Sequence, residues 1–137
     1  MTPQQIALVK STWAQVVPIR EQAAALFYGK LFEADPAVRS LFRSDMKGQG
    51  AKLMAMIDVA VGGLDRIESL LPAVQDLGRR HAGYGVEARH YETVGGALLA
   101  TLEAGLGPAF TPEAKAAWAA TYGALAGVMK AAAAQPA

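Results

Sequence analysis

One histidine of this chain has the surroundings that a metal ligand needs. His81 is one of only two histidines in 137 residues. Val74, Leu77 and His81 fall at i, i+3 and i+7 of a predicted helix, so their side chains share one apolar face. The imidazole is therefore expected to point towards the core, where its nitrogens need partners. A hydrogen-bonded core histidine is one interpretation, and a ligand of a bound metal is the other.

Composition limits the chemistry that is available to such a site. The chain has no cysteine, which excludes disulfides, iron–sulfur clusters, thiolate-bound haem and cysteine-based zinc sites. The net charge is +1 and Lys and Arg cluster only at Arg79–Arg80, so we expect no nucleic-acid partner. We find no signal-peptide pattern and no apolar run of about 18 residues. The sequence therefore predicts a cytoplasmic protein with no membrane span.

Helical periodicity runs through the whole sequence, in segments bounded by proline and glycine. Thr2–Pro3 and Asp35–Pro36 each place a capping residue before a proline, which predicts a helix start. Pro72 is expected to open the helix that carries His81, and Gly83 and Gly85 to end it. The predicted helices span about residues 3–17, 20–34, 36–42, 49–64, 72–83, 88–106 and 112–133, with a loop or frayed start at 43–50 and a turn or short helix at 65–71.

Several residues in these segments occur in a familiar order. Trp13 lies in the first predicted helix, Phe42 ends the third, and His81 ends a later one. With the segments Leu77–His81 and Leu106–Pro112, this order resembles the globin family along nearly the whole chain, and most of all neuroglobin and the single-domain bacterial globins. The resemblance implies one all-α globin domain over residues 1–137. Its seven or eight helices of unequal length would pack around a haem pocket, unlike the similar helices of a four-helix bundle.

The resemblance assigns His81 to the proximal position, where the imidazole Nε2 is the axial ligand of iron in haem b (iron protoporphyrin IX). The Nδ1–H group of such a ligand hydrogen-bonds to nearby backbone and fixes the ring. Phe42 falls on the position that packs against the porphyrin, a role compatible with an ordinary core residue. The other haem contacts that the resemblance implies are Leu53, Ile57, Leu77, Val86, Tyr91 and Val94, with Leu98, Tyr122 and Leu125 completing the wall.

Tyr28 and Gln49 fall on the distal positions, where a gas would bind, and Leu53 lies one helical turn after Gln49. A phenol and an amide that donate hydrogen bonds would stabilise O2, which gains negative charge on ferrous iron, more than CO. A solvated glutamine and a core tyrosine are the alternative interpretations. Because glutamine stands where many globins have the distal histidine, we expect five-coordinate ferrous iron rather than bis-histidine haem. Ferric iron is expected to take water, hydroxide or the Tyr28 oxygen.

Other residues near these positions are weaker ligand candidates. His90 is poorly placed as a second ligand because it begins the next helix on the proximal side. Tyr91 matches a proximal tyrosine of flavohaemoglobins, but Ala133 stands where their partner glutamate is expected, so that network is predicted to be incomplete. Met54 and Met56 are possible sulfur ligands, although methionines at helical spacing are more typical of a core.

The resemblance predicts reversible binding of O2, CO, NO and other diatomic gases, for storage, delivery or scavenging. The first alternative is nitric oxide dioxygenation, which would need a separate reductase because we expect no flavin domain in a chain of this length. The resemblance favours an O2-binding protein and leaves nitric oxide dioxygenase activity as the enzymatic alternative. Gas sensing through a partner protein and a haem-free helical interaction module are the remaining alternatives.

Overall fold

The chain folds entirely into helices over the residues that the computed structural model describes, 2–42 and 45–134, where it contains no strand. The α-helices are α1 (Pro3–Val16), α2 (Arg20–Ala34), α3 (Met46–Gly62), α4 (Ile67–Gly83), α5 (Ala88–Leu106) and α6 (Pro112–Ala134). Short 3-10 helices are η1 (Val17–Ile19), η2 (Pro36–Leu41), η3 (Leu64–Arg66) and η4 (Gly107–Ala109). The all-α prediction is confirmed, with six α-helices where seven or eight helices were expected; η2 takes the place of the short third helix.

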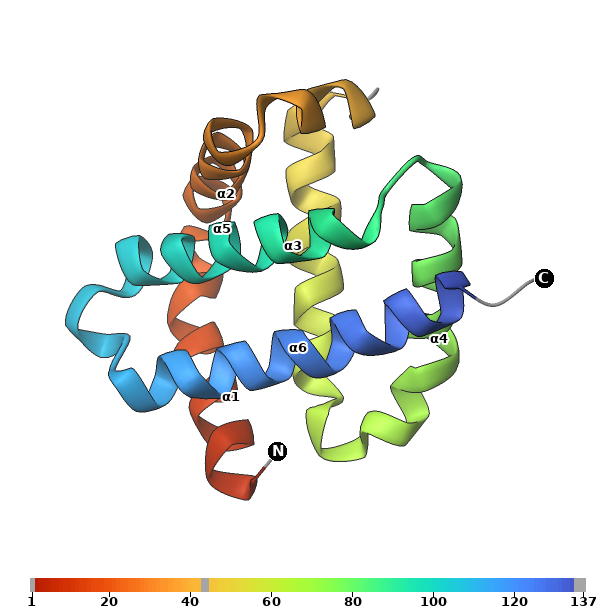
Figure 1. Cartoon of the computed structure of the whole chain (residues 1–137). Helices are drawn as coiled ribbons and strands as arrows, with labels where there is room; N and C mark the ends of the chain where they lie inside the picture. Colours follow the sequence, from red (N-terminus) through yellow and green to blue (C-terminus); the bar gives the residue numbers. More distant parts are fainter. Residues whose placement is uncertain (1, 43–44, 135–137) are drawn as a thin grey trace.

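The helices do not all lie side by side as in a bundle, because some of them cross others steeply. Figure 1 shows α5 and α6 running across α1 and α3, with α4 at one side of the molecule. The main packing partner of α4 is α6, whereas α3 packs on α2 and α1. Thus α3 and α4 are consecutive in the chain, joined through η3, but each rests on different helices. The predicted distal residue Gln49 and the predicted proximal residue His81 belong to these two helices.

Capping residues explain where α1 and α3 begin. Thr2 and Gln5 form a capping box at the start of α1, as the sequence predicts. The expected start of α3 near residue 49 is wrong, because the Asp45 carboxylate accepts hydrogen bonds from the backbone N–H groups of Lys47 and Gly48. These bonds begin α3 at Met46, so residues 46–50 are helical, while 43 and 44 lie outside the described residues.

The expected start of the His81 helix at Pro72 is also wrong. Helix α4 begins at Ile67 and Pro72 lies inside it. A proline in a helix removes one N–H hydrogen bond, but the half-buried side chains of Ile67, Leu70 and Leu71 keep the preceding turn packed. The other end agrees with the prediction, since Gly83 is the last helical residue and the backbone leaves through Gly85 at φ +95°.

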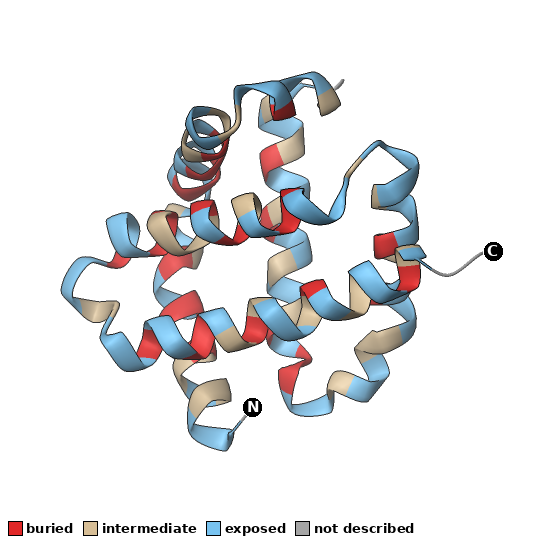
Figure 2. Cartoon of the chain, viewed as in Figure 1, coloured by how far each residue is buried: buried red, intermediate tan, exposed pale blue. Residues whose placement is uncertain are grey.

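Two clusters of buried side chains form the core, and Figure 2 shows the buried residues on the inner sides of the helices. The larger cluster includes Trp13 and Trp118, whose ring centroids lie 6.1 Å apart. Both indole N–H groups are satisfied, by the Asp58 carboxylate at 2.9 Å and the Thr12 hydroxyl at 2.8 Å respectively. The smaller cluster groups Phe27, Tyr28, Leu31, Val38 and Ala97, so the predicted distal tyrosine is part of a packed core.

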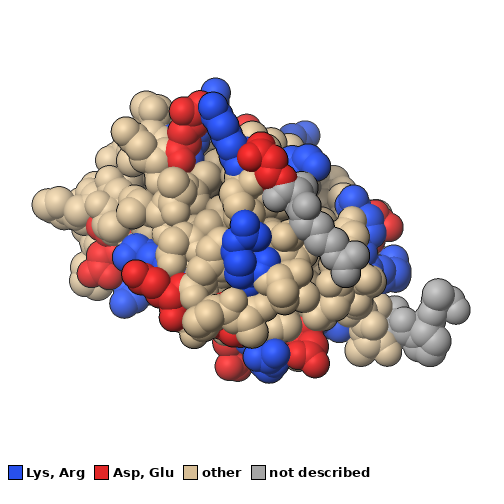
Figure 3. Space-filling view, turned by 90° about the horizontal axis from the view of Figure 1, so that it is seen from above, with Lys and Arg blue, Asp and Glu red and all other residues tan. Residues whose placement is uncertain are grey.

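The surface carries mixed charge. On the face drawn in Figure 3, acidic and basic side chains are interspersed instead of forming a patch of one sign. None of the helices in the described part of the chain is long and apolar enough to cross a bilayer.

Candidate functional site

The His81 ring is held by its own helix. Its Nδ1–H donates to the carbonyl oxygen of Leu77, one turn earlier in α4, at 2.8 Å. Burial lowers the pKa of His81 below its ordinary value of 6.5, a shift that the Leu77 carbonyl opposes and the Arg80 charge reinforces. The imidazole is therefore neutral at neutral pH, with the lone pair on Nε2. This Nε2 has no hydrogen-bond partner among the described residues, and it is not sealed in the interior.

These features fit a metal that brings most of its own ligands. Within residues 2–42 and 45–134, no three His, Cys, Asp or Glu side chains gather into a site for a bare ion. A single neutral imidazole with its second nitrogen fixed by a carbonyl is the donor set of haem iron. Most of the side chains that the family resemblance assigns to the haem also fit a flat apolar group, because they are only half-buried: Phe42, Leu53, Ile57, Leu77, Val86 and Val94. Tyr91, the remaining predicted contact, is buried.

Tyr28 and Gln49, from α2 and α3, come together on the predicted distal side. Tyr28 is 6% exposed, and burial raises the pKa of its hydroxyl, while a hydrogen bond with the Gln49 side chain acts in the opposite direction. The phenol is thus neutral and able to donate at neutral pH. Gln49 itself is half-buried.

Aromatic rings fix the orientation of Tyr28. The Phe27 and Phe42 rings meet it edge-on, with centroids 5.1 Å and 5.3 Å away, and Phe32 stacks on it at 5.9 Å. Such offset and edge-to-face contacts are the favourable geometries for aromatic pairs. Phe42, the predicted porphyrin contact, follows η2 and also packs edge-on against Phe32. The ring expected to touch haem and the phenol expected to face the gas are therefore in direct contact.

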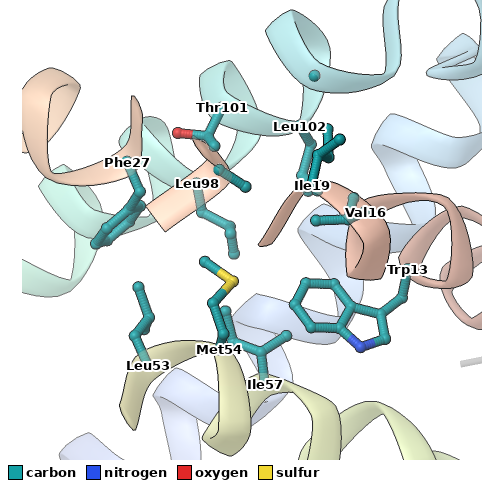
Figure 4. A pocket seen from close by; sticks show the side chains of 12 residues that line it. Trp13, Val16, Ile19, Phe27, Leu53, Met54, Ile57, Leu98, Thr101 and Leu102 are labelled. Carbon is teal, nitrogen blue, oxygen red and sulfur yellow. The ribbon is translucent and has the colours of Figure 1, made fainter. Parts of the chain in front are cut away.

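A small apolar cavity lies beside Phe27, and Figure 4 shows the side chains that line it. Leu53 and Ile57 of α3 face Phe27 and Leu98 across it, and Trp13 closes another side. Its volume of about 10 Å³ is room for roughly one water-sized molecule. Because its lining is almost wholly apolar, we expect it to stay dry. The sequence did not single out Phe27 as a site residue; the available signal was its helical spacing with Ala24 and Leu31, at i, i+3 and i+7.

Three further residues that the family resemblance places near the haem, Tyr91, Tyr122 and Leu125, lie on α5 and α6. Tyr91 and Tyr122 border a groove of about 340 Å³ between α5 and α6, and the Tyr122 hydroxyl donates to the Tyr91 carbonyl oxygen at 2.6 Å. Burial raises the pKa of both hydroxyls. Leu125 is half-buried on α6.

Two of the three weaker ligand candidates, His90 and Met54, have structural roles. His90 is buried at the start of α5, where its Nδ1 accepts a hydrogen bond from the Glu87 backbone N–H at 2.8 Å as part of a capping box. Met54 lies in the core and lines the apolar cavity, as expected for a packing residue. Met56 is 40% exposed on the outside of α3.

Comparison with known proteins shows the family to which the chain belongs. The family model described as Globin matches residues 25–129. Because this match covers more than half of the chain, the chain belongs to the globin family. Membership of this family of haem proteins supports haem-based gas binding.

Two kinds of relative are similar to the chain. It is 33% identical over 132 residues to the flavohemoproteins of Bordetella parapertussis and Bordetella bronchiseptica, an alignment that covers 94% of this chain and 33% of theirs. It is 30% identical over 129 residues to the neuroglobin of Danio rerio, with 84% of this chain and 81% of that protein covered. The chain thus spans about a third of the length of these flavohemoproteins.

Proposed function

We propose that this globin binds haem b through His81 and reversibly binds O2 and other diatomic gases on the Tyr28 side. The observation that carries the proposal is the His81 ring, fixed at Nδ1 by the Leu77 carbonyl and left with a free Nε2 among the described residues. Haem iron, when bound, supplies the coordination bond to the gas. The chain supplies the axial imidazole, the apolar walls and the distal hydrogen bonds.

The distal pair accounts for the preference among gases. Tyr28 is neutral, buried and oriented by three aromatic rings, so it donates a hydrogen bond without reorganising. Such preplaced donors favour a ligand that carries negative charge, which is the case for O2 more than for CO. A charge-assisted hydrogen bond is worth about 1.5–3 kcal/mol, or roughly ten- to hundred-fold in affinity.

The ultraviolet–visible spectra of the ferric, ferrous and oxygenated protein test this proposal. We expect haem uptake in a one-to-one ratio, a five-coordinate ferrous spectrum and a stable oxygenated form. A purified protein that takes up no haem would contradict the proposal and would favour a haem-free helical module. A six-coordinate ferrous spectrum in the absence of gas would contradict the expected open distal position.

Nitric oxide dioxygenation is the second candidate, favoured by the similarity to flavohemoproteins. In this reaction NO, O2 and one electron give nitrate, and the electron would come from a separate reductase. Stopped-flow mixing of the oxygenated protein with NO measures the single turnover, and nitrate formation with candidate reductases measures re-reduction. Repeated turnover would favour an enzyme, whereas a single turnover without re-reduction would favour binding or scavenging.

A further inference from the structure

Helix α4 lies directly against the backbone of α6 at Gly78, three residues before His81. A Cβ atom added at Gly78 would lie 2.4 Å from the carbonyl oxygen of Met129, and 2.6 Å and 2.8 Å from its Cα and carbonyl carbon. All three are backbone atoms of α6, so no side-chain rotation can relieve the contact. Of the chain's fourteen glycines, all of them described, Gly78 alone would bring an added Cβ against backbone.

This close approach lies beside the atoms that hold the proximal histidine. Leu77, whose carbonyl oxygen accepts the His81 Nδ1–H bond, immediately precedes Gly78. The residue whose carbonyl holds the imidazole, Leu77, and the residue that packs against the α6 backbone, Gly78, are thus consecutive in α4. Because α6 is the main packing partner of α4, a change in their separation moves Leu77 and His81 together.

The size of the change in the separation of α4 and α6 determines whether His81 is displaced enough to affect metal binding. Ordinary van der Waals contact for a Cβ begins at about 3.4 Å, so an alanine at position 78 requires α4 to withdraw from α6 by roughly 1 Å or to rotate. Metal–ligand distances are held within about 0.2 Å. A displacement several times that tolerance changes the distance or the angle at which Nε2 reaches an axial position.

We propose that Gly78 is a positioning residue for His81: its lack of a side chain lets α4 seat directly on the α6 backbone and thereby sets the position of Nε2. This inference rests on the proposed haem ligation by His81. Gly78 touches neither the haem nor the gas in this scheme, and it acts only through the histidine three residues later.

Gly83 gives a matched control in the same helix. It is exposed, lies two residues after His81, and has no atom within 4 Å of an added Cβ. We therefore compare Gly78→Ala with Gly83→Ala after haem reconstitution. The readouts are the iron–histidine stretching band of the ferrous protein and the rate of haem transfer to an excess of apomyoglobin. We expect a shifted stretching band and about tenfold or faster haem loss for Gly78→Ala, and wild-type values for Gly83→Ala.

A second pair of variants separates positioning from general damage. In His81→Gly with added imidazole, the axial ligand is no longer tethered to α4, so introducing Gly78→Ala should leave the iron–imidazole band unchanged. If Gly78→Ala folds incompletely, the spectra are recorded in trimethylamine N-oxide, which favours the folded state.

Two results would overturn the inference. One is a wild-type stretching band and haem-loss rate in Gly78→Ala. The other is an equal change of the band in the His81→Gly background with imidazole, which would indicate a general disturbance of the pocket. A wild-type protein that shows no iron–histidine band at all would instead contradict the proposed function.

Discussion

The Nδ1 atom of His81 lies 2.8 Å from the carbonyl oxygen of Leu77. A carbonyl oxygen only accepts, so this contact fixes the tautomer with the proton on Nδ1 and the lone pair on Nε2. The bond also prevents the ring from turning within α4. One backbone atom therefore determines both which nitrogen is available to a metal and the direction in which that nitrogen points.

Replacing His81 by alanine should abolish stable haem binding, because the described site has no second imidazole to take its place. His90 is engaged in capping α5 through its Nδ1. Adding free imidazole to His81→Ala should restore haem uptake, measured by the Soret absorbance after gel filtration. Alanine at His90 is not a clean control because it removes the cap, so Arg79→Ala, an exposed change in the same helix, serves instead. Undiminished haem retention in His81→Ala would refute the assignment of the ligand.

The lowered pKa of His81 predicts how the haem-free protein responds to acid. Burial keeps the folded pKa below the ordinary value of 6.5, so between these two values the unfolded chain binds more protons than the folded one. Stability then falls as the pH drops from above 6.5 through the folded pKa. We expect the unfolding free energy of the wild type to decline over this range relative to His81→Gln, measured by urea titrations at a series of pH values. Parallel curves for the two proteins would contradict the burial of this imidazole.

Replacing Tyr28 by phenylalanine should raise the O2 dissociation rate several-fold or more, up to about a hundred-fold, because a donor to a negatively charged ligand is lost. Laser photolysis and stopped-flow measurements give this rate. CO dissociation should change less, and Tyr84→Phe, which removes a hydroxyl from a side chain that is 63% exposed, should change neither rate. An unchanged O2 rate in Tyr28→Phe would mean that the hydroxyl does not reach the ligand.

The immediate surroundings of His81 could be predicted from the sequence because they depend on one helix. Periodicity places Val74, Leu77 and His81 on one face, and a histidine hydrogen bond to the carbonyl four residues earlier is a local contact within that helix. Gly83 and Gly85 end the helix as glycines usually do, the latter with a positive φ. Contacts within one helix can be predicted from a single segment of the sequence.

Contacts between distant segments were harder to predict. The hydrogen bond between Tyr28 and Gln49 joins two helices, and only the family resemblance brought these residues together. The close approach of Gly78 to Met129 involves backbone atoms 51 positions apart, and the one local sign of it is a glycine in a helix interior. Pro72 does not begin α4, because the packing of the preceding apolar turn outweighs the usual preference of proline for a helix start.

Replacing Thr12 by valine should destabilise the fold by about 1–3 kcal/mol, because the buried Trp118 N–H would lose its acceptor. Valine keeps the shape of threonine, so the loss reports on the hydrogen bond more than on packing. Ser11→Ala is the control, since the Ser11 hydroxyl is exposed and bonds only to its own helix; a change within about 0.5 kcal/mol is expected there. Urea unfolding followed by tryptophan fluorescence measures both, and equal stabilities of the two variants would contradict the role assigned to Thr12.

Pro72 offers the opposite case, a residue whose replacement should stabilise the protein. It lies inside α4 and is exposed, so alanine would lose little packing and would regain the N–H bond to the helix. A proline in a helix interior is about 3 kcal/mol less favourable than alanine, and the greater freedom of the unfolded chain takes back up to about 1 kcal/mol.

We therefore expect Pro72→Ala to raise the unfolding free energy by about 1–2 kcal/mol, measured by urea titration of the haem-free protein. Pro36→Ala is the matched control, because Pro36 occupies the first position of η2, where its missing N–H is no disadvantage; no gain is expected there. A loss of stability in Pro72→Ala would mean that the proline shapes α4 in a way that the packing of its first turns requires.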